Sequence, residues 1–308
     1  MQRPGLVTFK APSVEVRPDD DPRAMFARAW GCSAGAVKTV DEARVVIARL
    51  NPAAVFVGSR VGGETVDEAW GALASDRGTR APAHGQLVVD VIVAGEEPTL
   101  VGWHVHGSSR HVTPSGNFDF VVPEAAPSRA YGKAVEGLLW SGADIRPNEV
   151  MLEIGAAPGG TTLAYLERGL KVFAVDTQEM APVILAHPGF LGWMQKSIGE
   201  VEWEHLPETV QWISVDAGIS PVHMVRALRR LTLHYRGGLR GMLLTLKLND
   251  AAAVAAMPGL LEELTRGGAT VDAIQLPTNR SDLFVAVRYP RGKPTTHANR
   301  PFNVTLNE

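Results

Sequence analysis

The sequence predicts an α/β protein of two domains, the second of which contains a mainly parallel sheet. The first observation is a glycine-rich turn between two apolar runs in residues 150–176. The second is a set of further short apolar runs that begin or end in a charged residue. The third is a stretch rich in Pro and Gly at residues 114–127, which we interpret as the domain boundary. Residues 1–124 are then an N-terminal α+β domain, and residues 125–308 are a Rossmann-like domain.

The turn in residues 150–176 is the most informative stretch. Gly155, Gly159 and Gly160 allow backbone geometry that a β-carbon would forbid. Their spacing is G-x-x-x-G-G with Pro158 inside it, which matches neither the dinucleotide pattern nor the phosphate loop. No lysine follows the glycines. We therefore expect a nucleoside ligand such as S-adenosylmethionine in place of ATP or NAD; the alternative is a tight turn in an unrelated α/β protein.

The segments after the turn support a ligand site. Thr161 or Thr162 can cap the predicted helix. The apolar run 171–175 is continuous enough for a buried parallel strand, and it ends at Asp176. Asp176 lies sixteen residues past Gly160, about where the acid of a nucleotide-binding fold meets ribose hydroxyls.

The composition is that of an ordinary globular protein. The chain has 308 residues, of which 45% are hydrophobic and 20% are charged. A single cysteine, Cys32, excludes an internal disulfide and a cysteine-rich zinc site. No apolar run is long enough to span a membrane, and the N-terminus lacks the apolar core of a signal peptide. We therefore expect a cytoplasmic protein that is neither exported nor embedded in a membrane.

Charge is distributed unevenly along the chain. The formal net charge is −3, but residues 216–300 hold 12 Lys and Arg against 6 Asp and Glu, a difference of +6. Arg226, Arg229 and Arg230 fall three to four residues apart on a predicted helix, with Arg236 and Arg240 further on. These arginines could form one positive face that binds RNA phosphates. The alternative is an ordinary solvated helix face.

The N-terminal domain is predicted from local patterns. Strands are expected at residues 6–9, 54–57, 86–94 and 99–105, the last two paired as a hairpin. Helices are expected to start near Asp21, Thr39 and Thr65, the last two each with a capping box. His104 and His106 face the same side of the hairpin, but no cysteine or carboxylate pattern completes a metal site, so no metal is expected.

In the C-terminal domain, charged residues lie at the ends of apolar runs. Asp216 and Lys247 each end a predicted strand, Asp282 begins another, and Lys133 leads into a predicted helix. In a parallel sheet, the carboxyl ends of strands gather around one crevice. A lysine at such a place is unusual, because burying an ammonium costs several kcal/mol unless it is paired. We expect Asp216 and Lys247 to share this crevice with Asp176 and the glycine turn.

Six motifs give a family resemblance. PSRAYGK, GAAPGG, FAVD, SVD, TLKL and SDLFVAV occur in the order and spacing of the FtsJ-like ribose 2′-O-methyltransferases, and are most similar to the RlmM-type enzymes of 23S ribosomal RNA. The resemblance covers about residues 121–290. More faintly, GWHVHG and the segment up to PSR resemble the end of the family's RNA-binding THUMP region, so the N-terminal domain is expected to be THUMP-like.

The resemblance implies an activity and a set of site residues. It implies methylation of RNA at the ribose 2′-oxygen, on large-subunit ribosomal RNA, with S-adenosylmethionine as cofactor. The family's catalytic tetrad maps onto Lys133, Asp216, Lys247 and Asp282. The implied cofactor-binding residues are Gly155, Ala157, Pro158, Gly159, Gly160, Asp176, Ser197 and Asp216.

The chain departs from the family pattern at several positions. Asp282 stands where the family has glutamate, and Thr161 stands where it usually has tryptophan. Ser197 replaces an acid that contacts the adenosyl group, and Ala130 replaces a serine near the cofactor. The N-terminal domain is also shorter than the family's extension.

The implied chemistry assigns a role to each tetrad member. We expect Lys247 to be the general base, because desolvation and the neighbouring Lys133 would lower its pKa toward working pH. Lys133 and Asp282 would orient the hydroxyl, and Asp216 would position Lys247 or the methionine part of the cofactor. Two other functions remain open from the sequence: an RNA-binding protein that binds the cofactor without activity, and a small-molecule O-methyltransferase.

Overall fold

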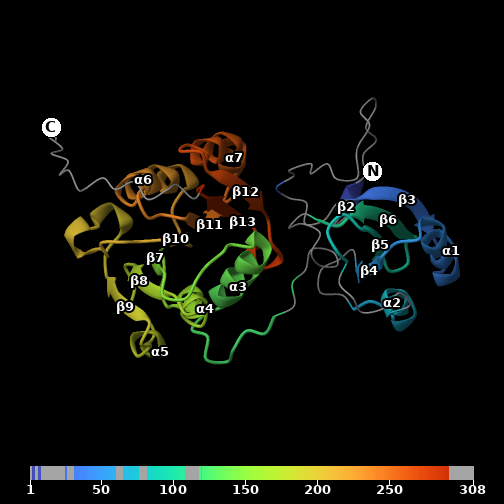
Figure 1. Cartoon of the computed structure of the whole chain (residues 1–308), viewed down its shortest axis with the longest axis horizontal. Coiled ribbons are helices and arrows are strands. Elements are labelled where there is room, and N and C mark those ends of the chain that lie inside the picture. Colours follow the sequence, from blue (N-terminus) through green and yellow to red (C-terminus); the bar gives the residue numbers. More distant parts are fainter. Residues whose placement is uncertain are drawn as a thin grey trace.

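The computed structural model describes residues 25, 31–59, 65–75, 82–107, 118 and 120–290, together with the backbone of two short strands, β1 (Gln2–Arg3) and β2 (Leu6–Val7). Most of the elements lie in two bodies, each built on one sheet (Figure 1). Apart from Met25, the helix predicted from Asp21 lies outside the described residues. The domain boundary at residues 124 and 125 stays a prediction.

The larger sheet has seven strands. They are β7 (Val150–Ile154), β8 (Lys171–Val175), β9 (Phe190–Met194), β10 (Trp212–Val215), β11 (Gly241–Lys247), β12 (Thr270–Ile274) and β13 (Asp282–Arg288). Their order is β12-β13-β11-β10-β7-β8-β9, and only β13 runs antiparallel to its neighbours. The predicted Rossmann-like, mainly parallel sheet is confirmed.

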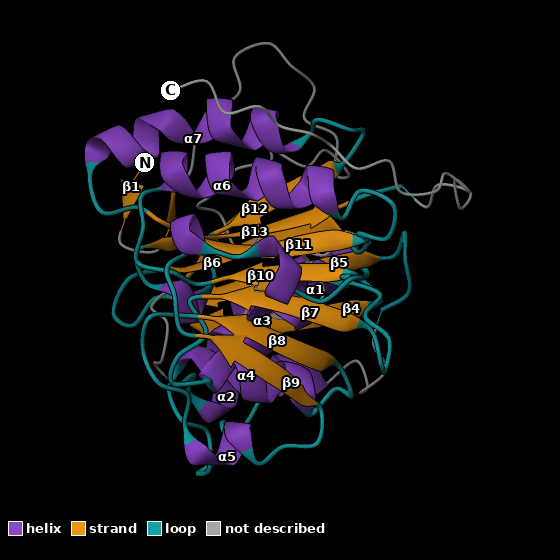
Figure 2. Cartoon of the chain, turned by 90° about the vertical axis from the view of Figure 1, so that its left-hand side faces the viewer, coloured by secondary structure: helices purple, strands orange, loops and turns teal. Residues whose placement is uncertain are grey.

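Helices cover both faces of this sheet. They are α3 (Ala130–Ser141), α4 (Gly160–Leu166), α5 (Pro182–Leu185), α6 (Pro221–His234) and α7 (Ala251–Leu264). Leu152 and Ile154 of β7 pack in one core with α6 and α7, whereas Met151 packs in a second core with α3 and α4. Figures 1 and 2 show α6 and α7 on one side of the strands and α3 and α4 on the other. Because both faces are covered, the strands read as continuous apolar runs.

The strand order creates a crevice at the centre of the sheet. β7 lies between β8 and β10, and the connections that leave β7 and β10 pass to opposite faces. Ligands of open α/β sheets bind at such a switch point, beside the carboxyl ends of the strands. The glycine turn follows β7 and Asp216 follows β10, so both lie at this point.

The smaller sheet has the order β3-β6-β5-β4. Its elements are β3 (Cys32–Val37), α1 (Val40–Leu50), β4 (Ala54–Ser59), α2 (Glu68–Ser75), β5 (Leu87–Val93) and β6 (Thr99–Val105). β4 and β5 are parallel and the other pairs are antiparallel. Ala43 and Ile47 of α1 and Leu73 of α2 pack on one face of the sheet. The predicted hairpin and the strand at residues 54–57 are present, but β3 was not predicted.

Two helix starts differ from the prediction. α2 begins at Glu68, three residues after Thr65, and Asp67 Oδ1 accepts from the Ala69 amide. α4 has Gly159 as its N-cap, so Thr161 and Thr162, predicted as caps, lie inside the helix. By contrast, α1 begins as predicted, with the side chain of Thr39 accepting from the Glu42 amide.

The described part of the chain contains no helix that is both long and apolar enough to cross a bilayer.

Candidate active site

Four charged side chains from four elements meet at the crevice. Lys133 lies in the first turn of α3, Asp216 directly follows β10, Lys247 ends β11, and Asp282 begins β13. Lys247 and Asp282 are register partners, because β11 and β13 are antiparallel. Gly137 lets α3 lie close to β13, since a β-carbon there would overlap the Phe284 ring. The predicted tetrad is therefore brought together in space.

The tetrad forms a closed ring of ion pairs. Lys133 Nζ lies 2.9 Å from Asp282 Oδ2 and 3.5 Å from Asp216 Oδ2. Lys247 Nζ lies 2.6 Å from Asp216 Oδ1 and 3.0 Å from Asp282 Oδ2. The four side chains are between 11% and 22% exposed, so the ring is largely shielded yet reachable from the crevice. Two positive and two negative charges balance within it, which offsets the cost of their partial burial.

The charge state expected of Lys247 needs a correction. Burial lowers the pKa of Lys247, but Asp216 and Asp282 raise it, and the pKa is raised overall. The expectation of a lowered pKa is therefore wrong for the chain as it stands. Desolvation acts as expected, but it is outweighed by two carboxylates within hydrogen-bond distance. Lys247 is a cation that donates to both of them.

The shorter side chain of Asp282 still reaches its partners. Its Oδ2 accepts from both Lys133 and Lys247, at 2.9 and 3.0 Å. Asp282 itself is only 8% exposed. The missing methylene, relative to the glutamate of the resembled family, therefore leaves no gap in the ring.

The glycine turn packs directly against the tetrad. Gly155 has φ of 78°, and a β-carbon there would lie 2.7 Å from backbone atoms of Asp216 and Ala217. The other two glycines make room for packing: a β-carbon would clash with Ile184 at Gly159 and with Ser128 at Gly160. Gly155 thus holds the turn next to the strand end that carries Asp216.

Asp176 stabilises the turn through its carboxylate. Oδ2 accepts from the Ala157 amide at 2.9 Å, and Oδ1 accepts from the Gln178 amide at 2.8 Å. The Ala157–Pro158 peptide bond of this turn is cis. Asp176 thus shapes the predicted cofactor turn, and each oxygen keeps a second lone pair for a ligand hydroxyl.

Ser197 follows β9 and binds an acid that the sequence motifs did not identify. The Ser197 hydroxyl donates to Glu200 Oε2 at 2.6 Å, and the Ser197 amide donates to the same oxygen at 3.2 Å. These hydrogen bonds hold the pKa of Glu200 below its usual range. Glu200 is therefore a carboxylate held beside Ser197, the position at which the resembled family has an acid in the sequence. The Ser-x-x-Glu spacing of a capping box was the available signal.

A second acid that was not predicted lies beneath the turn. Glu153 of β7 is 1% exposed, and its Oε2 accepts from the Thr162 hydroxyl at 2.7 Å. Its Oε1 has no hydrogen-bond partner among the described residues. Burial raises the pKa of Glu153 to about 8, with a smaller opposing effect from Thr162 and further raising by Asp216 and Asp176. This carboxyl holds its proton at neutral pH.

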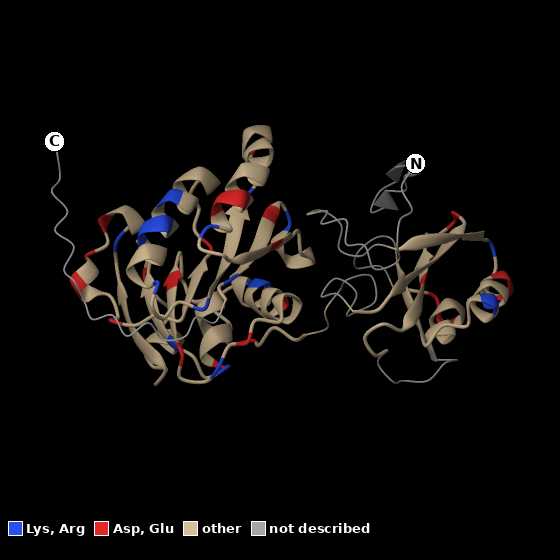
Figure 3. Cartoon of the chain, turned by 45° about the horizontal axis from the view of Figure 1, so that its top comes forward, with Lys and Arg blue, Asp and Glu red and all other residues tan. Residues whose placement is uncertain are grey.

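The three predicted RNA-binding arginines lie away from the tetrad, on α6. Arg226, Arg229 and Arg230 are all exposed, and Figure 3 shows basic segments on this helix. Arg230 alone contacts a ring, with its guanidinium carbon 5.2 Å from the centroid of Trp203. Arg240 does not belong to this face, because it is paired with Glu149 and Asp144.

The two histidines of the smaller sheet lie side by side as expected. The rings of His104 and His106 are 6.2 Å apart, and His104 Nδ1 lies 2.5 Å from Asp90 Oδ2. Within the described ranges, no group of three or more His, Cys, Asp or Glu is arranged to hold a metal ion.

Curated proteins of the RlmM type are similar in sequence to this chain. The protein of Halorhodospira halophila named Ribosomal RNA large subunit methyltransferase M is 28% identical over 179 residues, which are 57% of this chain and 51% of the relative. The protein of the same name from Colwellia psychrerythraea is 26% identical over 226 residues, 70% of this chain and 56% of the relative. The chain spans about half the length of the curated relatives it matches. The resemblance to the RlmM-type proteins is confirmed.

Solved structures resemble the chain more weakly. A 1,6-didemethyltoxoflavin-N1-methyltransferase of Burkholderia thailandensis, solved with S-adenosylhomocysteine, is 20% identical and covers 54% of this chain and 80% of its own, with a TM-score of 0.41. The magnesium protoporphyrin IX methyltransferase of Synechocystis is 14% identical, covers 52% and 80%, and has a TM-score of 0.38. No protein-family model matches the chain.

Proposed function

We propose that this chain methylates a ribose 2′-hydroxyl of RNA, on large-subunit ribosomal RNA, with S-adenosylmethionine as the methyl donor. The observation that carries the proposal is the closed ring of Lys133, Asp216, Lys247 and Asp282 beside the glycine turn at the switch point. The names of the curated relatives support the choice of RNA as substrate.

The residues around the crevice fit S-adenosylmethionine. Asp176, Glu200 and Asp216 follow the carboxyl ends of β8, β9 and β10, which lie on either side of β7, so their carboxylates border one edge of the sheet. Such acids suit ribose hydroxyls, an amine and a sulfonium, and they oppose a phosphate. Lys196 lies at the same edge, but its ammonium is paired with Glu202. The glycine turn, with Ala157 and Pro158, would hold the nucleoside from the β7 side.

The tetrad is suited to orient a hydroxyl and accept its proton. The cofactor, when bound, supplies a methyl group on a sulfonium. Lys133 and Lys247 offer ammonium donors that would hold the hydroxyl oxygen, and Asp216 and Asp282 offer carboxylate acceptors. Because the pKa of Lys247 is raised, we assign proton acceptance to the carboxylates and orientation to the lysines. Most of the rate gain would come from alignment of the attacking oxygen.

The smaller sheet is proposed as a THUMP-like RNA-binding domain. Its mixed sheet with two helices on one face is compatible with that role. The proposal rests on the sequence resemblance in the GWHVHG region, most of which lies in β6. RNA would then be held by this domain while the tetrad reaches one ribose.

The function is tested by mapping ribose methylation. Large-subunit ribosomal RNA from cells with and without the gene is compared for 2′-O-methylation, and the deletion strain is complemented with the wild type or with Lys247→Ala. We expect one site that is lost on deletion and restored only by the wild type. Identical methylation maps with and without the gene would contradict this substrate, and rescue by Lys247→Ala would contradict the assigned site.

A further inference from the structure

The exposed face of α6 presents three arginines in one direction. The helix packs its apolar side onto the sheet through Met224, Val225, Leu228 and Leu231. Arg226, Arg229 and Arg230 therefore point outward, and residues three or four apart on a helix are surface neighbours. Asp216 and Asp282 pair with the two lysines of the tetrad and not with these arginines.

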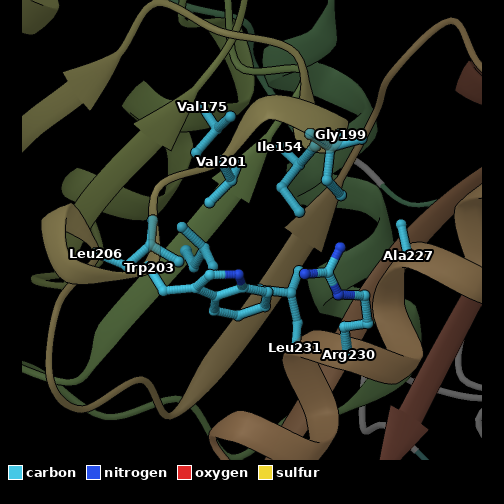
Figure 4. Close-up of a pocket in the computed structure, with 11 residues that line it drawn as sticks. Ile154, Val175, Gly199, Val201, Trp203, Leu206, Ala227, Arg230 and Leu231 are labelled. Atoms are coloured by element: carbon cyan, nitrogen blue, oxygen red, sulfur yellow. The ribbon is translucent and has the colours of Figure 1, made fainter. Parts of the chain in front are cut away.

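One of these arginines lies over a tryptophan. Trp203 belongs to a single 3-10 turn (Trp203–His205) between β9 and β10, and its ring also lies 5.0 Å from the ring of His234. Trp203 and Arg230 border a small apolar pocket whose other lining residues are Leu152, Ile154, Val175, Ile198, Gly199, Val201, Leu206, Ala227 and Leu231 (Figure 4). Trp203 is half-buried, so the apolar neighbours fix the plane of its ring.

Arg230 differs from Arg229 because its guanidinium contacts an aromatic ring, that of Trp203. A guanidinium is planar and stacks on aromatic faces, which restricts an otherwise mobile side chain. The Arg230 guanidinium carbon lies 5.2 Å from the centroid of the Trp203 ring, and the residue is exposed to solvent. Among the described residues, Arg229 lies over no aromatic ring. An ordered, exposed guanidinium plane is a surface on which an unpaired nucleobase can stack.

Charges around the contact are compatible with a polyanion. Glu202, next to Trp203, accepts from Lys196 and lies 2.8 Å from His205. Glu204 is the other acid of this segment, and it is exposed. Three outward arginines outnumber these acids, and Arg226 and Arg229 lie on the same exposed side of α6 as Arg230.

We propose that Arg230, held flat by Trp203, is a stacking platform for an unpaired base of the RNA substrate, and that Arg226 and Arg229 contact the adjoining phosphates. This inference rests on the proposed function in taking RNA as the partner. It also predicts a binding preference. The arginine face of α6 would bind single-stranded RNA more tightly than a polyanion that has no bases.

The test separates stacking from charge on the full-length chain. Binding of a fluorescent oligouridylate is measured by anisotropy, and dextran sulfate serves as the polyanion without bases. Arg230→Lys keeps the charge and removes the plane, whereas Trp203→Leu keeps an apolar side chain and removes the ring. Arg266→Lys is the matched control, because it makes the same change at an exposed arginine outside this face.

We expect Arg230→Lys and Trp203→Leu each to weaken oligouridylate binding about tenfold, a typical effect of losing one stacked base, and to leave dextran sulfate binding unchanged. Arg266→Lys should stay within about twofold of the wild type on both probes, because this arginine is outside the proposed face. Wild-type affinity of Arg230→Lys for oligouridylate would overturn the proposal, even if Trp203→Leu fails to fold. Equal losses on both probes would also overturn it, because they would show charge alone. Methyl transfer by the wild type together with either result would leave the proposed function intact.

Discussion

The tetrad and the arginine face of α6 place cations in different surroundings. In the tetrad, Lys133 and Lys247 sit between two carboxylates, and neither lysine side chain is more than 22% exposed. On α6, three arginines are exposed, and only Arg230 is ordered by a contact, with an aromatic ring. In the first arrangement the cations have carboxylate partners, and in the second they face solvent. Positive charge in a sequence therefore means little until its counter-groups are known.

The largest effect is expected from breaking the tetrad. Lys247→Ala should lower the single-turnover rate of methyl transfer at least about a hundredfold, because it removes one of the two ammonium groups that join Asp216 to Asp282 and leaves two carboxylates with Lys133 alone. Cofactor affinity, measured by calorimetry, should change less than about threefold. Its control is Lys171→Ala, in which the lysine lies at the start of β8, away from the crevice. A rate within about threefold of the wild type would remove Lys247 from the site.

A smaller change in the ring should have an intermediate effect. Asp282→Asn keeps the size of the side chain but removes the charge that faces both lysines, so we expect a rate about tenfold lower, or roughly 1.4 kcal/mol at the barrier. Asp282→Glu should not exceed the wild type, because the distances of 2.9 and 3.0 Å are already made with the shorter side chain. Activation by glutamate would show that the native ring is misaligned.

Glu153 differs from the tetrad carboxylates because it is a buried acid whose hydrogen-bond partner is the Thr162 hydroxyl and not a cation. The pKa of Glu153 is about 8 in the folded chain, against an ordinary value near 4.5 when unfolded. Between these pH values the unfolded chain releases the proton and the folded chain keeps it, so the free energy of unfolding falls as pH rises, by up to about 1.4 kcal/mol per pH unit. Above about pH 8 the fall should level off.

Glu153→Gln should remove this contribution, because an amide does not titrate. Urea unfolding at about pH 5, 6, 7 and 8 measures the difference between wild type and variant. We expect the variant to gain stability relative to the wild type across this series. A constant difference at all four pH values would show that Glu153 is ionised in the folded chain.

Substitutions on the arginine face of α6 should have smaller effects than those in the tetrad. Their effect on RNA binding should depend on the salt concentration. Arg226→Gln combined with Arg229→Gln should weaken oligouridylate binding similarly for unrelated sequences, since phosphate contacts position without specifying. The slope of log affinity against log salt should become shallower by about 0.7 for each phosphate that the variant no longer neutralises. Arg266→Gln, at an exposed arginine after α7, is the control. If the double variant keeps the wild-type slope, these arginines are ordinary solvated residues.

The smallest expected effect is the change of the wild-type single-turnover rate with pH. Since the pKa of Lys247 is raised, a lysine base would be mostly protonated below that pKa, and the rate would rise about tenfold per pH unit through the neutral range. With carboxylates as acceptors, we expect the single-turnover rate to be nearly constant from about pH 7 to 9. A slope of one would return the general-base role to Lys247.

The sequence by itself determined the local elements of the large sheet. The apolar runs and the glycines predicted β7, the turn and β8, because strand burial and positive φ are properties of short segments. The motif resemblance also identified the four residues that meet in the ring. The sequence predicted the wrong helix start where several neighbouring residues could each begin the helix. α2 begins at Glu68 and not near Thr65, and Gly159 caps α4 in place of Thr161 or Thr162.

The tertiary structure alone decided the electrostatics. Whether Lys247 has a lowered or raised pKa depends on Asp216 and Asp282, which reach it from other elements at 2.6 and 3.0 Å. The contact of Arg230 with the Trp203 ring likewise joins residues from a 3-10 turn and a helix. The energies of charge pairs and ring contacts depend on distances through space, and sequence spacing does not determine those distances until the sheet has formed.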